Sequence, residues 1–107
     1  MPEPSEQPLR IEQRPGERVL ALDGELDMAD TDTLVEAAAP LAAEPGDLTL
    51  DLGGVTFIDS SGLLAILRTA DQMADGRLIL LRPAEQLRKV FDMVELAAVS
   101  PRIVIAD

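Results

Sequence analysis

Hydrophobic residues recur along this chain at two spacings, which predict short strands separated by helices. Alternation with a period of two, or a short aliphatic run, is typical of a strand. Such stretches cover residues 9–14, 19–23, 48–52, 78–81 and 103–105, the last being either a short strand or a packed tail. The turn signal Pro15-Gly16 joins the first two stretches into a predicted hairpin. A turn at Gly53-Gly54 is predicted to separate the third stretch from a short apolar approach to Asp59.

Apolar spacings of three and four residues predict helices between these strands. The first helix is expected to begin at Asp30 or Thr31, both good N-caps, and Pro40 is expected to kink it or end it early. The second is predicted from Ser60 to Ala74, with Asp75-Gly76 as its end. The third begins near Pro83, with an apolar stripe of Leu87, Val90, Phe91 and Val94.

A helical wheel of the second helix predicts which of its residues pack on the sheet. That face comprises Leu63, Ile66, Leu67, Ala70 and Met73. Ser61 then lies opposite this face and Ser60 lies on its flank, so both hydroxyl groups are expected to reach solvent. On geometry alone, Ser61 is slightly favoured as the more accessible hydroxyl.

Strands that alternate with helices of this length predict an α/β fold. We expect a single mixed sheet of four to five strands, with at least one parallel pair and three to four helices mainly on one face. Residues 1–8 are predicted to be a flexible N-terminal tail, and residues 9–107 a single domain. Apolar residues make up 47% of the chain, yet only two are Phe and none is Trp or Tyr, so the core must be aliphatic.

The net charge of −11, from nine Lys and Arg against twenty Asp and Glu, restricts the classes of partner. Nucleic-acid binding depends on cations that neutralise phosphates, so this chain is a poor candidate for it. Anionic membrane surfaces are disfavoured for the same reason. A basic groove on a protein partner fits the charge, although simple solubility explains it equally well.

The absence of Cys and His excludes several kinds of chemistry. Disulfides, zinc sites of the usual kind and His-based catalytic triads all require one of these residues. Lys89 is the only lysine, nothing in the spacing brings it near a serine, and the phosphate-cradling glycine loops are absent. We therefore expect no enzymatic activity, cofactor or metal. Without a signal peptide or membrane span in the sequence, the expected location is the cytoplasm.

The segment Asp59-Ser60-Ser61-Gly62 stands between an apolar run and a predicted helix. A helix start has unpaired N–H groups and a partial positive charge, so it accepts either a capping side chain or a phosphate. One interpretation is that Asp59 or Ser60 only caps the helix. The other is that a serine here is a phosphorylation switch, because a phosphate adds about −1.5 to −2 charges at neutral pH.

Three segments carry a resemblance to a known family. In order and spacing, these three segments resemble the STAS domain of bacterial anti-sigma factor antagonists. They are Val55 to Leu63 (VTFIDSSGL), Gly24 to Asp27 (GELD) and Leu87 to Leu96 (LRKVFDMVEL). The resemblance covers roughly Ile11 to Val104. It implies a small α/β STAS-like sandwich, in agreement with the pattern analysis.

The resemblance also implies a function in transcription regulation, as in stress response or sporulation. The unphosphorylated antagonist binds an anti-sigma factor that is also a serine kinase, and so releases the sigma factor. Phosphorylation breaks that complex and a serine phosphatase restores it. By this resemblance the phosphorylated residue is Ser60, with Ser61 as the runner-up. The implied partner-binding residues are Asp27, Asp59, Ser60, Ser61, Gly62 and Leu64, on a monomer or weak dimer.

A second hypothesis is a constitutive adaptor. STAS domains also occur in transporters and stress-signalling assemblies, and aliphatic residues like Leu63 and Leu64 are also found in relatives that do not switch. In that case the chain would be a structural subunit that is never phosphorylated, and its binding would depend on apolar surface such as Leu64.

Overall fold

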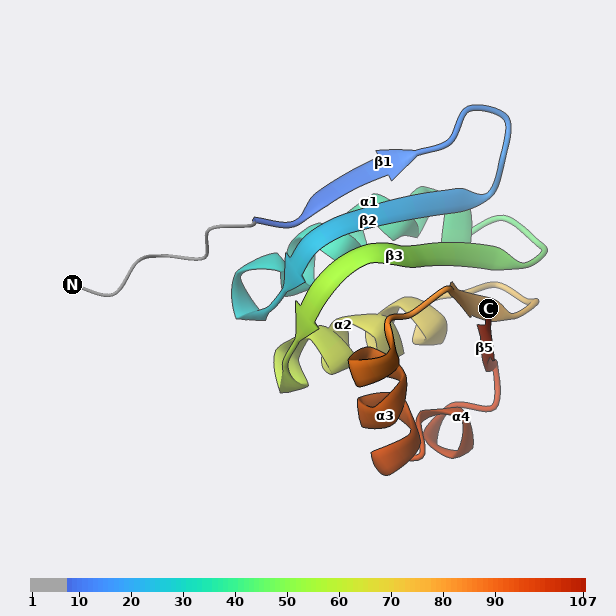
Figure 1. The fold of residues 1–107 in the computed structure, drawn as a ribbon. Coiled ribbons are helices and arrows are strands. Elements are labelled where there is room, and N and C mark those ends of the chain that lie inside the picture. The colour runs from blue at the N-terminus through green and yellow to red at the C-terminus, as the bar shows by residue number, and fades with distance from the viewer. Residues whose placement is uncertain (1–7) are drawn as a thin grey trace.

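A computed structural model describes residues 8–107, which form one five-stranded mixed sheet with helices packed on it (Figure 1). The strands are β1 (Arg10–Gln13), β2 (Val19–Leu26), β3 (Leu48–Ile58), β4 (Leu78–Leu81) and β5 (Ile103–Ala106). They lie in the order of the sequence. The β1–β2 hairpin is antiparallel, and β2, β3, β4 and β5 run parallel to one another. The predicted α/β class and mixed sheet are confirmed, and the uncertain stretch at 103–105 is a strand.

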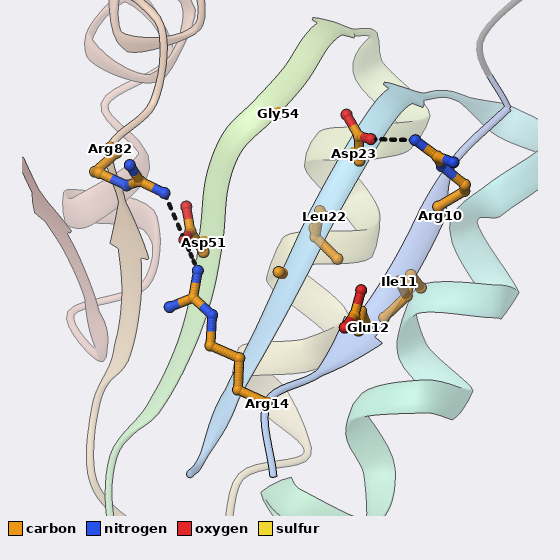
Figure 2. A pocket seen from close by; sticks show the side chains of 10 residues that line it. Arg10, Ile11, Glu12, Arg14, Leu22, Asp23, Asp51, Gly54 and Arg82 are labelled. Atoms are coloured by element: carbon orange, nitrogen blue, oxygen red, sulfur yellow. Dashed lines mark hydrogen bonds and ion pairs between the residues drawn. The ribbon is translucent and has the colours of Figure 1, made fainter.

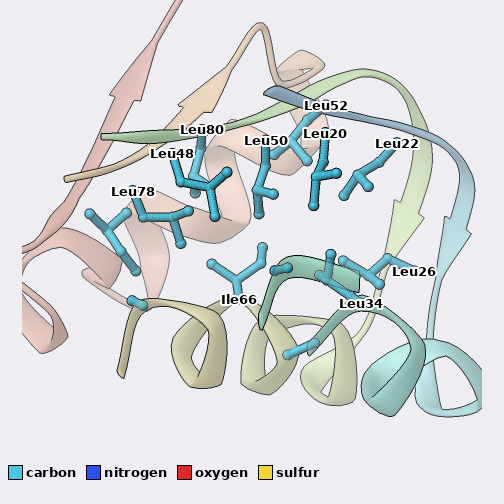
Figure 3. Packing of buried hydrophobic residues seen from close by; sticks show 14 of the residues in the cluster. Leu20, Leu22, Leu26, Leu34, Leu48, Leu50, Leu52, Ile66, Leu78 and Leu80 are labelled. Atoms are coloured by element: carbon cyan, nitrogen blue, oxygen red, sulfur yellow. The ribbon is translucent and has the colours of Figure 1, made fainter. Parts of the chain in front are cut away.

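The helical segments are η1 (Met28–Asp30), a 3-10 helix, followed by α1 (Thr31–Ala42), α2 (Ser60–Asp71), α3 (Glu85–Met93) and α4 (Leu96–Val99). Alternate residues of β2, β3 and β4 point toward these helices and are nearly all leucine, as Figure 3 shows. Leu34 of α1, Ile66 of α2 and Phe91 of α3 join the same core. The predicted aliphatic core is thus confirmed, with Phe91 as its one buried aromatic among the described residues.

The predicted turn at Gly53-Gly54 is wrong, because β3 continues through both glycines to Ile58. Strand β2 likewise continues to Leu26, beyond the predicted end at Asp23. Continuous pairing between the two strands satisfies the backbone groups that a turn would expose. The pairing register shifts twice along this stretch, so the glycines mark an irregularity within a strand.

Two helix boundaries also differ from the prediction. Pro40 lies inside α1, and the helix continues past it to Ala42. Helix α2 ends at Asp71, three residues before the predicted Ala74, because the chain turns to bond with α1. The Ala74 N–H donates to the Ala42 carbonyl over 2.8 Å, and the Gln72 amide donates to the Val35 carbonyl over 3.0 Å.

The third predicted helix is confirmed as α3, and a further short helix, α4, follows it. Helix α3 begins at Glu85, after Pro83, and ends at Met93, and α4 follows after Glu95. Glu95 adopts a left-handed conformation with φ of 52°, which an α-helix cannot contain. Val94, predicted in the apolar stripe, is therefore at the helix end and 41% exposed, whereas Leu87 and Phe91 are buried.

The buried face of α2 is rotated relative to the helical-wheel prediction. Its buried residues are Gly62, Ala65, Ile66, Thr69 and Ala70, while Leu63 and Leu67 are only partly buried at the margin of the core. Helix α2 packs against α1 as well as the sheet, so small residues are needed on the side facing α1. A wheel computed for one contact surface cannot represent a helix that has two.

Candidate partner-docking and phosphorylation site

Ser60 is the first residue of α2, directly after β3, where the chain leaves the end of the sheet. Asp59 is the N-cap in extended conformation, and its Oδ1 accepts the Gly62 N–H over 2.9 Å. The capping interpretation is therefore correct for Asp59. It leaves Ser60 free, because Ser60 is exposed and its hydroxyl has no hydrogen-bond partner among residues 8–107.

Ser61 is less accessible than Ser60, contrary to the helical-wheel prediction. Ser61 is half-buried near the start of α1, where the Thr31 Oγ1 donates to the Ser61 carbonyl over 3.2 Å. The wheel prediction considered only the contact with the sheet, whereas the start of α1 also lies against Ser61. Accessibility and the family resemblance thus both favour Ser60 as the residue that an enzyme can reach.

Gly62 was predicted as a partner-binding residue, but in the structure it makes close contacts within the chain. Gly62 is buried, and a Cβ there would lie 2.4 Å from the Leu26 carbonyl oxygen and 2.6 Å from Ile58 Cγ1. Such distances are well inside van der Waals contact, so only glycine fits without a shift of the backbone. Gly62 therefore positions α2 against the ends of β2 and β3.

This packing brings Asp27 to the same end of the sheet, because Asp27 follows Leu26 directly. Asp27 is the N-cap of η1, and its Oδ1 accepts the Ala29 N–H over 3.1 Å. The next carboxylate is Asp30, whose pKa is raised by burial and then by the neighbouring Asp27. Asp27, Asp30 and Asp59 form no ion pair with any residue in the range 8–107. The end of the sheet is thus a negative surface without internal neutralisation.

Two large apolar side chains are exposed on the same elements. Leu64, one helical turn after Ser60, is 43% exposed, in agreement with its predicted place on the surface. Met28 of η1 is 76% exposed, and η1 lies against α2. Met28 was not predicted as a site residue. Its position next to Asp27, in a loop between two predicted elements, was the signal that could have identified it.

We use the term switch surface for Asp27, Met28, Asp59, Ser60 and Leu64. These residues come from two segments, the start of η1 and the start of α2, that are more than thirty positions apart in the sequence and meet at the C-terminal ends of adjacent parallel strands. Ligand and partner sites in parallel sheets commonly form at this end. The switch surface offers an accessible hydroxyl, exposed apolar groups and uncompensated negative charge.

A comparison with protein-family models identifies the family of the chain. The STAS domain model matches residues 8–104. The chain belongs to the STAS domain family. No curated protein sequence matches the chain.

Solved structures of anti-sigma factor antagonists share this fold over nearly the whole chain. Antagonist SpoIIAA in its unphosphorylated form is 25% identical, with a TM-score of 0.70, covering 94% of this chain and 89% of SpoIIAA. An antagonist from Mycobacterium paratuberculosis is 24% identical, with a TM-score of 0.68, covering 96% of this chain and 89% of its own. A putative antagonist from Thermotoga maritima is 20% identical, with a TM-score of 0.66, and the coverage is 94% of this chain and 86% of that one.

None of the helices in residues 8–107 has the length and apolar character that crossing a membrane requires.

Proposed function

We propose that this STAS domain is an anti-sigma factor antagonist that acts by partner switching. In its unphosphorylated form it binds a serine-kinase anti-sigma factor and releases the sigma factor. Phosphorylation of Ser60 by that kinase abolishes the complex, and a serine phosphatase restores the active form. The observation that carries the proposal is the exposed, unbonded Ser60 hydroxyl at the start of α2, next to Asp59 and at the same end of the sheet as Asp27, two carboxylates that form no ion pair within residues 8–107.

The unphosphorylated switch surface fits a partner groove that is cationic and partly apolar. Asp27 and Asp59 already bond to backbone N–H groups, which fixes the position of each carboxylate before the partner arrives. Fixed charges lose little conformational freedom on binding. Met28 and Leu64 supply exposed apolar area that a partner can bury. These features favour a preformed docking surface that needs no refolding.

Phosphorylation would reverse this complementarity without unfolding the domain. The N–H of Gly62 is already occupied by Asp59, so a phosphate on Ser60 would extend outward from the helix start. It would add about −1.5 to −2 charges beside Asp27 and Asp59. Unpaired like charges in a closed interface commonly cost a few kcal/mol, so binding would weaken by about 100-fold or more.

The chain itself has no enzymatic role in this proposal. The kinase and phosphatase act on Ser60 in trans, and the antagonist uses no cofactor or metal. It works as a cytoplasmic protein, as a monomer or weak dimer, and it does not contact nucleic acid or membrane. The similarity to SpoIIAA, described as an anti-sigma factor antagonist with an unphosphorylated form, supports this assignment.

Incubation of the chain with ATP and the serine-kinase anti-sigma factors of its source organism tests the proposal. Fragment-ion mass spectrometry should locate one phosphate on Ser60, and titration should show Ser60→Asp binding about 100-fold more weakly than Ser60→Ala. Ser61→Ala serves as the matched control and should still be phosphorylated. A phosphate on Ser61 would keep the function and change the site. Equal binding by Ser60→Asp and the unmodified chain would refute the electrostatic mechanism.

One observation favours the second candidate, a constitutive adaptor subunit. Met93, Val94 and Val99 are exposed by 80%, 41% and 61% on α3, α4 and their junction, away from Ser60. A partner held by those residues would be insensitive to the state of Ser60. Stable co-purification that survives every change at Ser60 but is lost on Val99→Asp would support the adaptor and count against partner switching.

A further inference from the structure

The face of the sheet opposite the helices has an open hollow of about 780 Å³. Figure 2 shows it in close-up, with side chains of β1, β2 and β3 and the residue after β4 around it. Ala21 and Gly54 are among the lining residues, and their small size leaves space that larger side chains would fill. Small-ligand sites commonly have volumes of about 300–1,000 Å³, so a small molecule fits here.

The charged centre of the hollow is Asp51, whose side chain is only 3% exposed. Arg14 and Arg82 approach this carboxylate from opposite sides (Figure 2), and both donate to the same oxygen, Oδ2. The Arg82 contact measures 2.8 Å, and the Gly53 N–H donates to the other oxygen, Oδ1, over 3.0 Å. Two guanidinium groups thus contact one carboxylate, so these three groups together carry a net charge of +1, whereas the whole lining of the hollow, which also includes Arg10, Glu12 and Asp23, has no net charge.

Both guanidinium groups retain donors that face the solvent side of the hollow. A guanidinium has about five N–H donors, and among residues 8–107 neither Arg14 nor Arg82 bonds through its side chain to anything but Asp51. Their side chains are 39% and 59% exposed, so a ligand can reach these donors. Adjacent forked donors suit the oxygens of a carboxylate or phosphate group.

The backbone of Arg82 is constrained, and its side chain is held by the hydrogen bond to Asp51. Arg82 has a φ of 55°, in the left-handed region, and its N–H donates to the Ala106 carbonyl over 2.8 Å. Gly53 permits the guanidinium to lie across β3, since a Cβ there would be 3.0 Å from Arg82 Nη2. The donors are therefore preorganised, which reduces the entropy lost on binding a ligand.

We propose that this hollow binds a small organic anion, whose oxyanion group bridges the guanidinium groups of Arg14 and Arg82 while its body lies over Ala21 and Gly54. Glu12 and Asp23 also line the hollow, and Arg10 neutralises Asp23 through a 2.6 Å ion pair. Glu12 is left as the negative group that opposes an anion. The site is separate from the switch surface, and the proposal does not depend on the proposed function.

Titration of the full chain with phenyl phosphate and with benzoate, against chloride at equal ionic strength, tests this proposal without any partner protein. Amide chemical-shift changes should centre on Arg14, Gly54 and Arg82. Binding of one probe or both supports the site, and the comparison shows whether phosphate or carboxylate is preferred. If neither probe binds better than chloride, or if the shifts lie elsewhere, the proposal is wrong.

Variants separate a specific site from general electrostatics. Arg14→Gln and Arg82→Gln should each weaken binding at least about tenfold, because each removes a charged hydrogen-bond donor. Arg88→Gln, which removes the same charge from an exposed ion pair with Asp107, is the matched control and should leave affinity unchanged. Glu12→Gln should tighten binding about two- to threefold, a gain that misfolding cannot produce. An equal loss of affinity for the probe in Arg88→Gln and Arg14→Gln would overturn the proposal.

Discussion

The two charged regions of this domain use their carboxylates in opposite ways. On the switch surface, Asp27 and Asp59 accept backbone N–H groups and have no cation beside them in residues 8–107. On the open face of the sheet, Asp51 is buried between two arginines. The first region faces solvent with its negative charge uncompensated, whereas the second balances a buried charge inside the fold.

This difference separates recognition from stability. Ser60 is exposed and its side chain has no hydrogen-bond partner among residues 8–107, so phosphorylation can add charge to the switch surface at little cost to the fold. A buried ion pair is sensitive to the loss of either member, because the remaining group is left without its partner. A change at Ser60 should therefore alter binding to a partner, whereas a change at Asp51 should alter the free energy of unfolding.

The largest expected effect would break the geometry of the switch surface itself. Gly62→Ala places a Cβ against the Leu26 carbonyl and Ile58, and should lower the free energy of unfolding by about 3 kcal/mol, at the upper end for overpacking. Gly16→Ala is the control, since its φ is 74° but no atom lies within 4 Å of the new Cβ. It should cost only about 1 kcal/mol. Urea denaturation measures both, and equal losses would show that packing at Gly62 is not limiting.

The next largest effect is the pH dependence of the stabilisation by Asp51, on the open face of the sheet. Burial alone would raise the pKa of Asp51, but hydrogen bonds from Arg82, the Gly53 N–H and Arg14 lower it below its usual value of 3.8. The ionised carboxylate therefore stabilises the fold above about pH 4, and this stabilisation is lost as pH falls through the lower folded-state pKa. Asp51→Asn should lower the free energy of unfolding by about 2 kcal/mol at neutral pH.

The difference in the free energy of unfolding between Asp51→Asn and the unmodified chain should shrink as pH falls below about 4. Urea denaturation at a series of pH values measures it. Asp71→Asn is a suitable control, because Asp71 is exposed and its carboxylate has no partner among residues 8–107. A difference that is constant with pH would mean that Asp51 stabilises the fold by packing alone.

The smallest effect sharpens the role of the switch surface. Met28→Ala and Leu64→Ala should each weaken binding to the proposed anti-sigma factor partner about tenfold, which corresponds to about 1.4 kcal/mol. Both side chains are exposed, so the free energy of unfolding should change by less than about 0.5 kcal/mol. Met93→Ala is the matched control, because Met93 is 80% exposed and Met28 is 76% exposed. Greater loss of binding in Met93→Ala would place the docking surface on α3 and α4.

Much of the fold followed from the sequence because the signals were local. Alternating leucines predicted β3 and β4, and Asp59-Ser60 marked the start of α2 to the residue. Errors arose where a long-range contact overrode a local preference. The glycines at 53 and 54 predicted a turn, but pairing with β2 kept them in a strand. Contacts with α1 ended α2 before Ala74.

The sequence by itself determined the family, the aliphatic core and the candidate serine, since each depends on residue type and spacing along the chain. Tertiary structure alone decided which hydroxyl is accessible, that Gly62 packs against Leu26, and that Met28 joins the switch surface. It also brought Arg14 and Arg82 to Asp51, residues separated by 37 and 31 positions. Sequence spacing cannot reveal such meetings, because the order and register of parallel strands fix them only when the sheet forms.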